Sequence, residues 1–139
     1  MKSLGTIFSP EISPIHKMTF SVATQLILTA GELTTALATG HIPAGKLLAT
    51  KSATDGDTII SNPIAGASVT VADGKAVGIL AHDVEVKAGV TDYSVGVMIS
   101  GEVYEDVMTK ANGVAVTTAN KEALAKQNIL FYNVKTLKK

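Results

Sequence analysis

The chain has 139 residues, enough for one domain with its own core but short for two. All 12 of its basic residues are lysines, its 12 acidic residues bring the formal net charge to zero, and this balance without any arginine argues against a nucleic-acid-binding protein. With 46% hydrophobic residues and no cysteine, the chain is not intrinsically disordered and has no disulfide, thiolate metal site or cysteine nucleophile. No stretch has the apolar length of a signal peptide or a membrane span, so we expect no membrane partner.

The first 17 residues combine prolines with apolar side chains. Pro10 and Pro14 block a regular helix or strand, while Leu4, Phe8 and Ile15 make the segment adhesive. We predict an extended arm over residues 1–17, followed by one domain over residues 18–139. Three interpretations of the arm stay open: it packs on its own domain, it becomes ordered on a partner, or it is disordered.

The next segments favour strands. Residues 18–28 alternate loosely, with Met18, Phe20 and Val22 on one side. The residues that follow Gln25 are ambiguous between a strand and a helical turn. Residues 41–51 predict a turn at Pro43 followed by a strand.

The clearest local signal is Asp73-Gly74 between two apolar runs over residues 69–80. This dipeptide predicts a two-residue hairpin turn, because both positions tolerate a positive φ. Residues 84–87 also alternate.

Residues 93–103 predict a long strand. The alternation places one set of side chains on a single face: Tyr93, Val95, Val97 and Ile99. Glycines 78, 96 and 101 lie within strand patterns and indicate bulges or close approach of another backbone.

One helix is predicted over residues 118–128, with Thr118 as the N-cap, and a closing strand is predicted over residues 129–134. Together these elements predict a mainly β chain with one or two short helices, a β-rich α+β fold. We expect a small β-sandwich or barrel-like domain with an extended N-terminal arm.

No motif predicts catalysis. The three histidines, at positions 16, 41 and 82, lack metal-ligand spacing. Ser68 lies in a segment that approaches a nucleophile elbow, but Thr70 replaces the final glycine and no helix pattern follows. We therefore expect no enzymatic activity, no metal and no cofactor, and infer a structural or binding role.

Two motifs, Asp73-Gly-Lys-Ala-Val-Gly-Ile-Leu-Ala81 and Gly101-Glu-Val-Tyr-Glu-Asp-Val107, resemble segments of the lambda-type bacteriophage head decoration proteins, which stabilise capsids. Residues 73–81 resemble the central strand of that family, and residues 101–107 resemble the segment that leaves the following strand. The motif residues are Asp73, Gly74, Ala76, Val77, Gly78, Ile79, Leu80, Tyr104, Glu105, Asp106 and Val107. The resemblance covers approximately residues 40–113.

The resemblance implies a homotrimer at three-fold sites on the outer surface of the phage head. Such a virion protein would bind the major capsid protein and stabilise the shell against packaged DNA. It would reside in the host cytoplasm during assembly. In the family an N-terminal arm adds a strand to a capsid sheet. The corresponding capsid contacts here would be Leu4, Thr6, Ile7, Phe8, Ile12 and Ile15.

Two alternatives stay open. The first is a phage head fibre or adhesin that also binds cells or glycans, although an aromatic content of 4% offers few stacking platforms for sugars. The second is a β-clip accessory domain of a metabolic enzyme, because residues 42–48 also resemble the entry of such domains.

Overall fold

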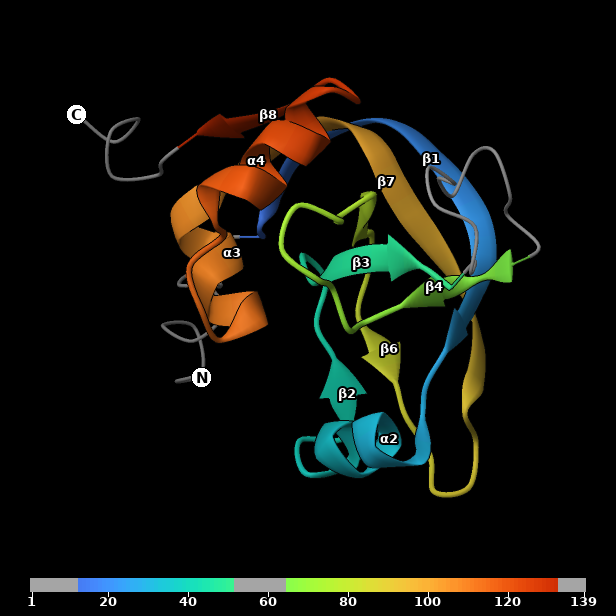
Figure 1. Ribbon diagram of the computed structural model, residues 1–139. Coiled ribbons are helices and arrows are strands. Elements are labelled where there is room, and N and C mark those ends of the chain that lie inside the picture. Colours follow the sequence, from blue (N-terminus) through green and yellow to red (C-terminus); the bar gives the residue numbers. More distant parts are fainter. Residues whose placement is uncertain (1–12, 52–64, 133–139) are drawn as a thin grey trace, which may run out of the picture.

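Two long antiparallel strands form the spine of the structure (Figure 1). β1 (Ile15–Ile27) pairs with β7 (Asp92–Tyr104) from Ile15↔Val103 to Ile27↔Asp92. The computed structural model describes residues 13–51 and 65–132. The shorter described elements are α2 (Ala30–Leu37), β2 (His41–Ile42), β3 (Leu47–Thr50), β4 (Ala67–Ser68), β5 (Gly78–Leu80), β6 (Val84–Glu85), α3 (Glu105–Asn112), α4 (Thr118–Ala125) and β8 (Ile129–Tyr132).

Five strands close into a barrel. β1 pairs with β4, β4 with β3, β3 with β5, β5 with β7, and β7 with β1 again. β8 adds to β7 in parallel outside this ring, and β2 and β6 form a separate two-stranded sheet. The prediction of a mainly β, barrel-like α+β domain is confirmed, with three helices in the described part of the chain.

One hydrophobic cluster fills the inside of the ring. Each strand of the ring contributes a buried residue to it: Leu26, Leu48, Ala67, Leu80 and Val97. The predicted face of residues 93–99 is confirmed, because Val95, Val97 and Ile99 belong to this cluster and Tyr93 packs against it. Burying each of the leucine and valine side chains in this cluster contributes about 1.5–3 kcal/mol.

A second cluster lies on the outside of the ring. Leu47, Ile79 and Met98 lie side by side on β3, β5 and β7 and point away from the interior. Met108 of α3, Leu124 of α4 and Ile129 of β8 cover them, so the two C-terminal helices and β8 form an outer layer.

The predicted hairpin at Asp73-Gly74 is wrong. The two residues do form a turn, with Lys75 N–H donating to Ala72 O at 2.9 Å, but only Gly74 has a positive φ. The flanking strands do not pair with each other: β4 pairs with β1 and β3, whereas β5 pairs with β3 and β7. The runs around the turn thus have more distant partners.

The helices differ from the sequence prediction in three ways. α2 and α3 were not predicted, and the N-cap of α4 is Thr117 rather than Thr118. The Thr117 hydroxyl accepts a hydrogen bond from Asn120 N–H at 3.2 Å. A cap one residue earlier places Asn120, not Lys121, at the third helical position.

α2 begins with a capping box. Thr29 Oγ1 accepts from Glu32 N–H at 3.1 Å, and Thr29 N–H donates to Glu32 Oε1 at 2.8 Å. Burial alone would raise the pKa of Glu32, but hydrogen bonds from Thr70 and Thr29 and the charge of Lys51 outweigh it. The pKa of Glu32 therefore lies below its ordinary value.

Candidate interaction surface

The outer half of β1, residues 15–21, carries apolar side chains into solvent. Met18 is 49% exposed and Phe20 is 57% exposed. Pairing with β7 slips between Met18 and Phe20 and again between Phe20 and Ser21. These irregularities separate the exposed residues from Val22, whose side chain packs on the barrel interior.

Gly101 of β7 makes the closest approach in this region. Its φ is +152°, and a Cβ at this position would lie 2.2 Å from Lys17 O. Only glycine fits, because any side chain would collide with the β1 backbone. The prediction of a close backbone approach at residue 101 is confirmed.

The outer layer presents a second exposed apolar site on β8. Leu130 pairs with Glu102 and Tyr132 pairs with Tyr104, so each pair shares the face opposite the second cluster. Leu130 is 50% exposed and Tyr132 is 37% exposed. Four of the seven exposed large hydrophobic residues in the described ranges therefore lie on β1 and β8.

The start of β1 is firmly attached to the domain. Tyr104 N–H donates to Pro14 O at 2.8 Å, and the Tyr104 hydroxyl lies 2.7 Å from His16 Nδ1. His16 Nε2 lies 3.8 Å from Glu102 Oε1. A Cβ on Gly45 would lie 2.5 Å from Pro14 Cγ, so the proline packs directly on the β2–β3 turn. Residues 14–17 thus belong to the folded domain.

The first resembling motif lies mainly in the core. Ile79 and Leu80 are fully buried, and Gly78 is so close to Val97 that a Cβ would lie 2.4 Å from its Cγ1. Asn120 Oδ1 of α4 accepts from Gly74 N–H at 2.8 Å and from Ala76 N–H at 3.2 Å. The side chain of Asp73 accepts from the Thr117 hydroxyl, and Val77 packs against the interior cluster. These residues hold the fold together.

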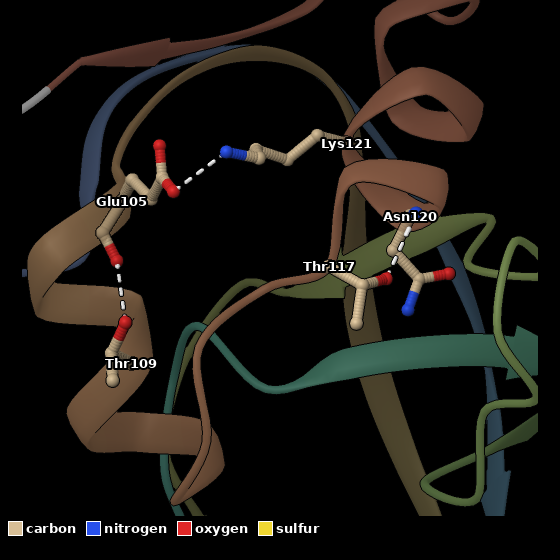
Figure 2. Close-up of polar contacts among 5 residues, drawn as sticks. All are labelled: Glu105, Thr109, Thr117, Asn120 and Lys121. Carbon is tan, nitrogen blue, oxygen red and sulfur yellow. Dashed lines mark hydrogen bonds and ion pairs between the residues drawn. The ribbon is translucent and has the colours of Figure 1, made fainter.

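The second motif spans the end of β7 and the first turn of α3. Glu105 Oε2 accepts from Lys121 Nζ at 2.8 Å, which ties α3 to α4 (Figure 2). The figure also shows Thr109 bonded to the Glu105 carbonyl, and Thr117 capping α4. Tyr104, Asp106 and Val107 are half-buried around this junction. The motif therefore joins the barrel to its outer layer.

The groove between β3 and the α3–α4 connection has a volume of about 300 Å³. Asn112 lines it, but its oxygen accepts from Leu47 N–H at 2.8 Å and its nitrogen donates to Gly45 O at 3.0 Å and Met108 O at 2.9 Å. The Asn120 oxygen is engaged in the motif turn. These amide contacts hold the walls of the groove together.

No group of three or more metal-ligating side chains gathers within residues 13–51 and 65–132. Both ring nitrogens of His82 contact backbone atoms, with Nδ1 lying 3.0 Å from Asp83 O and Nε2 accepting from Gly96 N–H at 3.2 Å. The Asp83 carboxylate accepts from Ala44 N–H at 2.8 Å. The side chains of His82 and Asp83 therefore hold neighbouring backbone segments in place. No helix of the described residues is long and apolar enough to cross a membrane.

Among the six predicted capsid contacts, only Ile15 falls on described residues. It pairs with Val103 and packs against the second cluster, so it supports the fold and is also the first residue of β1. The other five lie outside the described residues: Leu4, Thr6, Ile7, Phe8 and Ile12. Sequence reasoning missed Leu130 and Tyr132, and the unbroken run Ile-Leu-Phe-Tyr over residues 129–132 would have been the signal, because a strand with one buried face needs apolar residues only at alternate positions.

Comparison of the chain with protein-family models, with curated proteins and with solved structures finds no match in any of the three.

Proposed function

We propose that this chain is a non-enzymatic bacteriophage capsid decoration protein. It would bind the outside of the mature head as trimers at three-fold sites, contact the major capsid protein, and stabilise the shell against packaged DNA. The observation that carries the proposal is the exposed outer half of β1. There the barrel presents Met18 and Phe20 on a strand paired with β7, a few residues after the N-terminal segment.

The chemistry of this surface suits protein contacts. Exposed methionine and phenylalanine side chains on an ordered strand are typical of interaction surfaces. His16, Glu102 and Tyr104 lie at the same end of β1 and β7 and supply polar groups beside these apolar side chains. A trimer would present this surface three times, so that modest single contacts would add up to tight binding.

The resemblance gives separate support. The two motif segments are distant in the sequence, but β5 pairs with β7, through Ile79↔Met98 and Leu80↔Val97. The second motif begins three residues after Met98, so the two motifs lie close together along β5 and β7. This arrangement is what we expect if the resemblance reflects a common fold rather than two chance matches.

The test is to mix the protein with mature, DNA-filled heads of the phage that encodes it, after removal of any decoration protein. Cryo-electron microscopy should show density at the three-fold sites. Density only at hexamer centres, or none at all, would contradict the proposal and favour the fibre or accessory-domain alternative.

A paired variant tests the surface itself. Met18→Ser combined with Phe20→Ser should reduce occupancy of the heads at least tenfold, because it removes the apolar contacts without touching the core. Leu37→Ser is the matched control: Leu37 is also exposed, at 38%, but lies on α2 at the far end of the barrel (Figure 1). Equal loss of binding in both would argue against a specific role for β1.

Deletion of residues 1–12 tests the contribution of the N-terminal segment. The deletion spares Pro14 and Ile15, whose contacts with Tyr104 and Val103 belong to the fold. We expect an unchanged melting temperature and loss of head binding. Full occupancy by the truncated protein would show that the segment is not a capsid contact.

A further inference from the structure

The groove between β3 and the α3–α4 connection contains a hydrogen-bond donor that the fold leaves unused. Asn120 lines this groove and is only 6% exposed. Its side-chain amide accepts from Gly74 N–H and Ala76 N–H, so the accepting atom must be the oxygen and the other atom the nitrogen. This Nδ2 donates to no atom of the described residues. Because no fully enclosed side-chain nitrogen or oxygen in residues 13–51 and 65–132 lacks a partner, Nδ2 must be accessible from the groove.

Asn112 lines the same groove and shows the contrast. Both hydrogens of its amide are bonded, to Gly45 O at 3.0 Å and to Met108 O at 2.9 Å. In Figure 2 the oxygen and the nitrogen of the Asn120 amide diverge, and the nitrogen lies on the side of Thr117, another lining residue. An amide N–H that is largely buried without a partner costs free energy, and a ligand oxygen would remove this cost. Asn120 Nδ2 is therefore a donor that the groove offers to a ligand.

The walls beside Asn120 suit an extended peptide. Val69 and Val71 follow β4, and Val114 and Ala115 lie in the α3–α4 connection. None of these four lining residues belongs to a helix or strand or forms a backbone–backbone hydrogen bond with another described residue. Their N–H and C=O groups can therefore pair with a chain laid along the groove, while the valine side chains contact its apolar groups. Backbone pairing combined with side-chain pockets is a general mode of peptide recognition.

The charges that line the groove cancel each other. Lys46 is positive and Asp73 is negative, and the other described lining residues are uncharged. An anion would be repelled by Asp73 and a cation by Lys46. A peptide unit carries no net charge and offers an oxygen to Asn120 or Lys46 and an N–H to Asp73. The charges thus favour a neutral peptide over a small ion.

We propose that this groove binds an extended segment of a partner protein. A branched aliphatic side chain of the segment would lie against Leu47 and the valines, and a carbonyl oxygen beside it would accept from Asn120 Nδ2. The groove volume of about 300 Å³ is at the lower end of the roughly 300–1,000 Å³ of ligand pockets, so it holds one side chain with its adjoining peptide groups. No described lining residue belongs to β1, so the inference goes beyond the proposed function and does not depend on it.

NMR with a blocked tripeptide tests the proposal on the full chain. Titration with acetyl-Ala-Leu-Ala-amide should shift the Asn120 side-chain amide signals progressively to saturation. The Asn112 side-chain signals should move much less, because both hydrogens are already bonded within the fold. Acetyl-Ala-Asn-Ala-amide, whose central side chain has nearly the same size but is polar, should bind at least ten times more weakly. Unchanged Asn120 signals, or equal binding of the two tripeptides, would overturn the proposal.

Two small probes distinguish a peptide from a metabolite. Free leucine has the same side chain but lacks the neighbouring peptide groups, and isovalerate is an anion with the same branched chain. Both should bind at least ten times more weakly than the leucine tripeptide, because neither pairs with the backbone of residues 69–71 and 114–115. Binding of either probe as tight as that of the tripeptide would indicate a small-molecule site and would overturn the proposal.

Asn120→Asp tests the donor directly. The carboxylate keeps an oxygen that accepts from Gly74 N–H and Ala76 N–H but replaces Nδ2 with a second acceptor. We expect at least a tenfold loss of affinity for the leucine tripeptide, because two oxygens would face each other. Thermal melting establishes that the variant is folded. Undiminished affinity of the folded variant would contradict the role given to Asn120.

Val114→Ser tests the wall of the groove without touching the core. Val114 is 68% exposed, so its truncation should leave the melting temperature unchanged and weaken binding of the leucine tripeptide about fivefold. Val90→Ser is the matched control, because Val90 is also an exposed valine, at 40%, but lies between β6 and β7 and does not line the groove. It should leave the affinity unchanged. Equal affinities of the two variants would overturn the proposal.

Discussion

The two halves of β1 have the same partner strand but different surroundings. Residues 22–27 pair with residues 92–97 of β7 and alternate between buried and exposed, with Leu26 fully buried. Residues 15–21 also pair with β7, yet none of them is fully buried. Pairing with β7 therefore makes both halves a strand, and only closure of the barrel behind the inner half makes that half part of the core.

This difference separates two roles within one element. The inner half contributes hydrophobic burial that the fold requires, so its sequence is constrained by packing. The outer half is held by backbone hydrogen bonds and by its contacts with Tyr104 and Glu102. Its exposed side chains are free to serve a partner, which is why we assign the proposed surface to it.

A charge introduced on each side of this division should have opposite consequences. Val97→Asp places an unpaired carboxylate beside Val22 inside the barrel and should abolish folding, since its cost exceeds about 4 kcal/mol. Phe20→Asp should change the free energy of unfolding by less than about 0.5 kcal/mol. Circular dichroism with thermal melting measures both, and a folded Val97→Asp protein would show that the interior is assigned wrongly.

Truncation of one side chain in each half sharpens the comparison within a single strand. Leu26→Ala should lower the free energy of unfolding by about 2–5 kcal/mol, because it leaves a cavity in the barrel interior. Met18→Ala should stay within about 0.5 kcal/mol of the native protein. Urea denaturation gives both values, and similar losses would mean that the outer half is packed in solution.

Local patterns in the sequence predicted those features of the fold that depend on residues close together in the chain. The alternation of residues 93–99 identified one face of β7 correctly, because a strand with one buried face needs that period. The positions of β3 and α4 and the start of β8 were also predicted. Thr29 and Glu32 carry a capping-box signal that would have predicted α2 had it been weighed.

Distant pairing could not be predicted in the same way. The run before Asp73-Gly74 looks like one arm of a hairpin, but in the barrel β3 lies between β4 and β5 and pairs with both of them. α3 was missed because residues 101–107 continue a strand pattern, and helix formation begins only where β7 ends at Tyr104. The exposed face of β8 depends on where α4 and β7 lie, which a single sequence does not specify.

The irregular pairing of the outer half with β7 can be tested through Gly101, which pairs with Met18. Gly101→Ala forces a Cβ against Lys17 O at a φ of +152° and should destabilise the protein by about 2 kcal/mol. Gly31→Ala is the matched control, because no atom lies within 4 Å of the added Cβ in α2, and it should stabilise by up to about 1 kcal/mol. Thermal melting distinguishes the two signs. Equal effects would mean that the offset of the outer half does not depend on this glycine.

The smallest effect concerns the junction where the inner half of β1 continues into α2. Because the pKa of Glu32 is lowered in the folded protein, its stabilising effect is present above the unfolded value of about 4.3 and is lost as the pH falls through the folded value. Glu32→Gln keeps an acceptor for Thr29 and Thr70 but removes the charge. It should therefore cost about 0.5 kcal/mol at pH 7 and almost nothing at pH 3.

Thr70→Ala removes one donor to Glu32 and should show an intermediate pH dependence. Parallel stability curves for native protein and Glu32→Gln between pH 3 and pH 7 would show that the charge contributes nothing, and that the end of the inner half is held by packing alone.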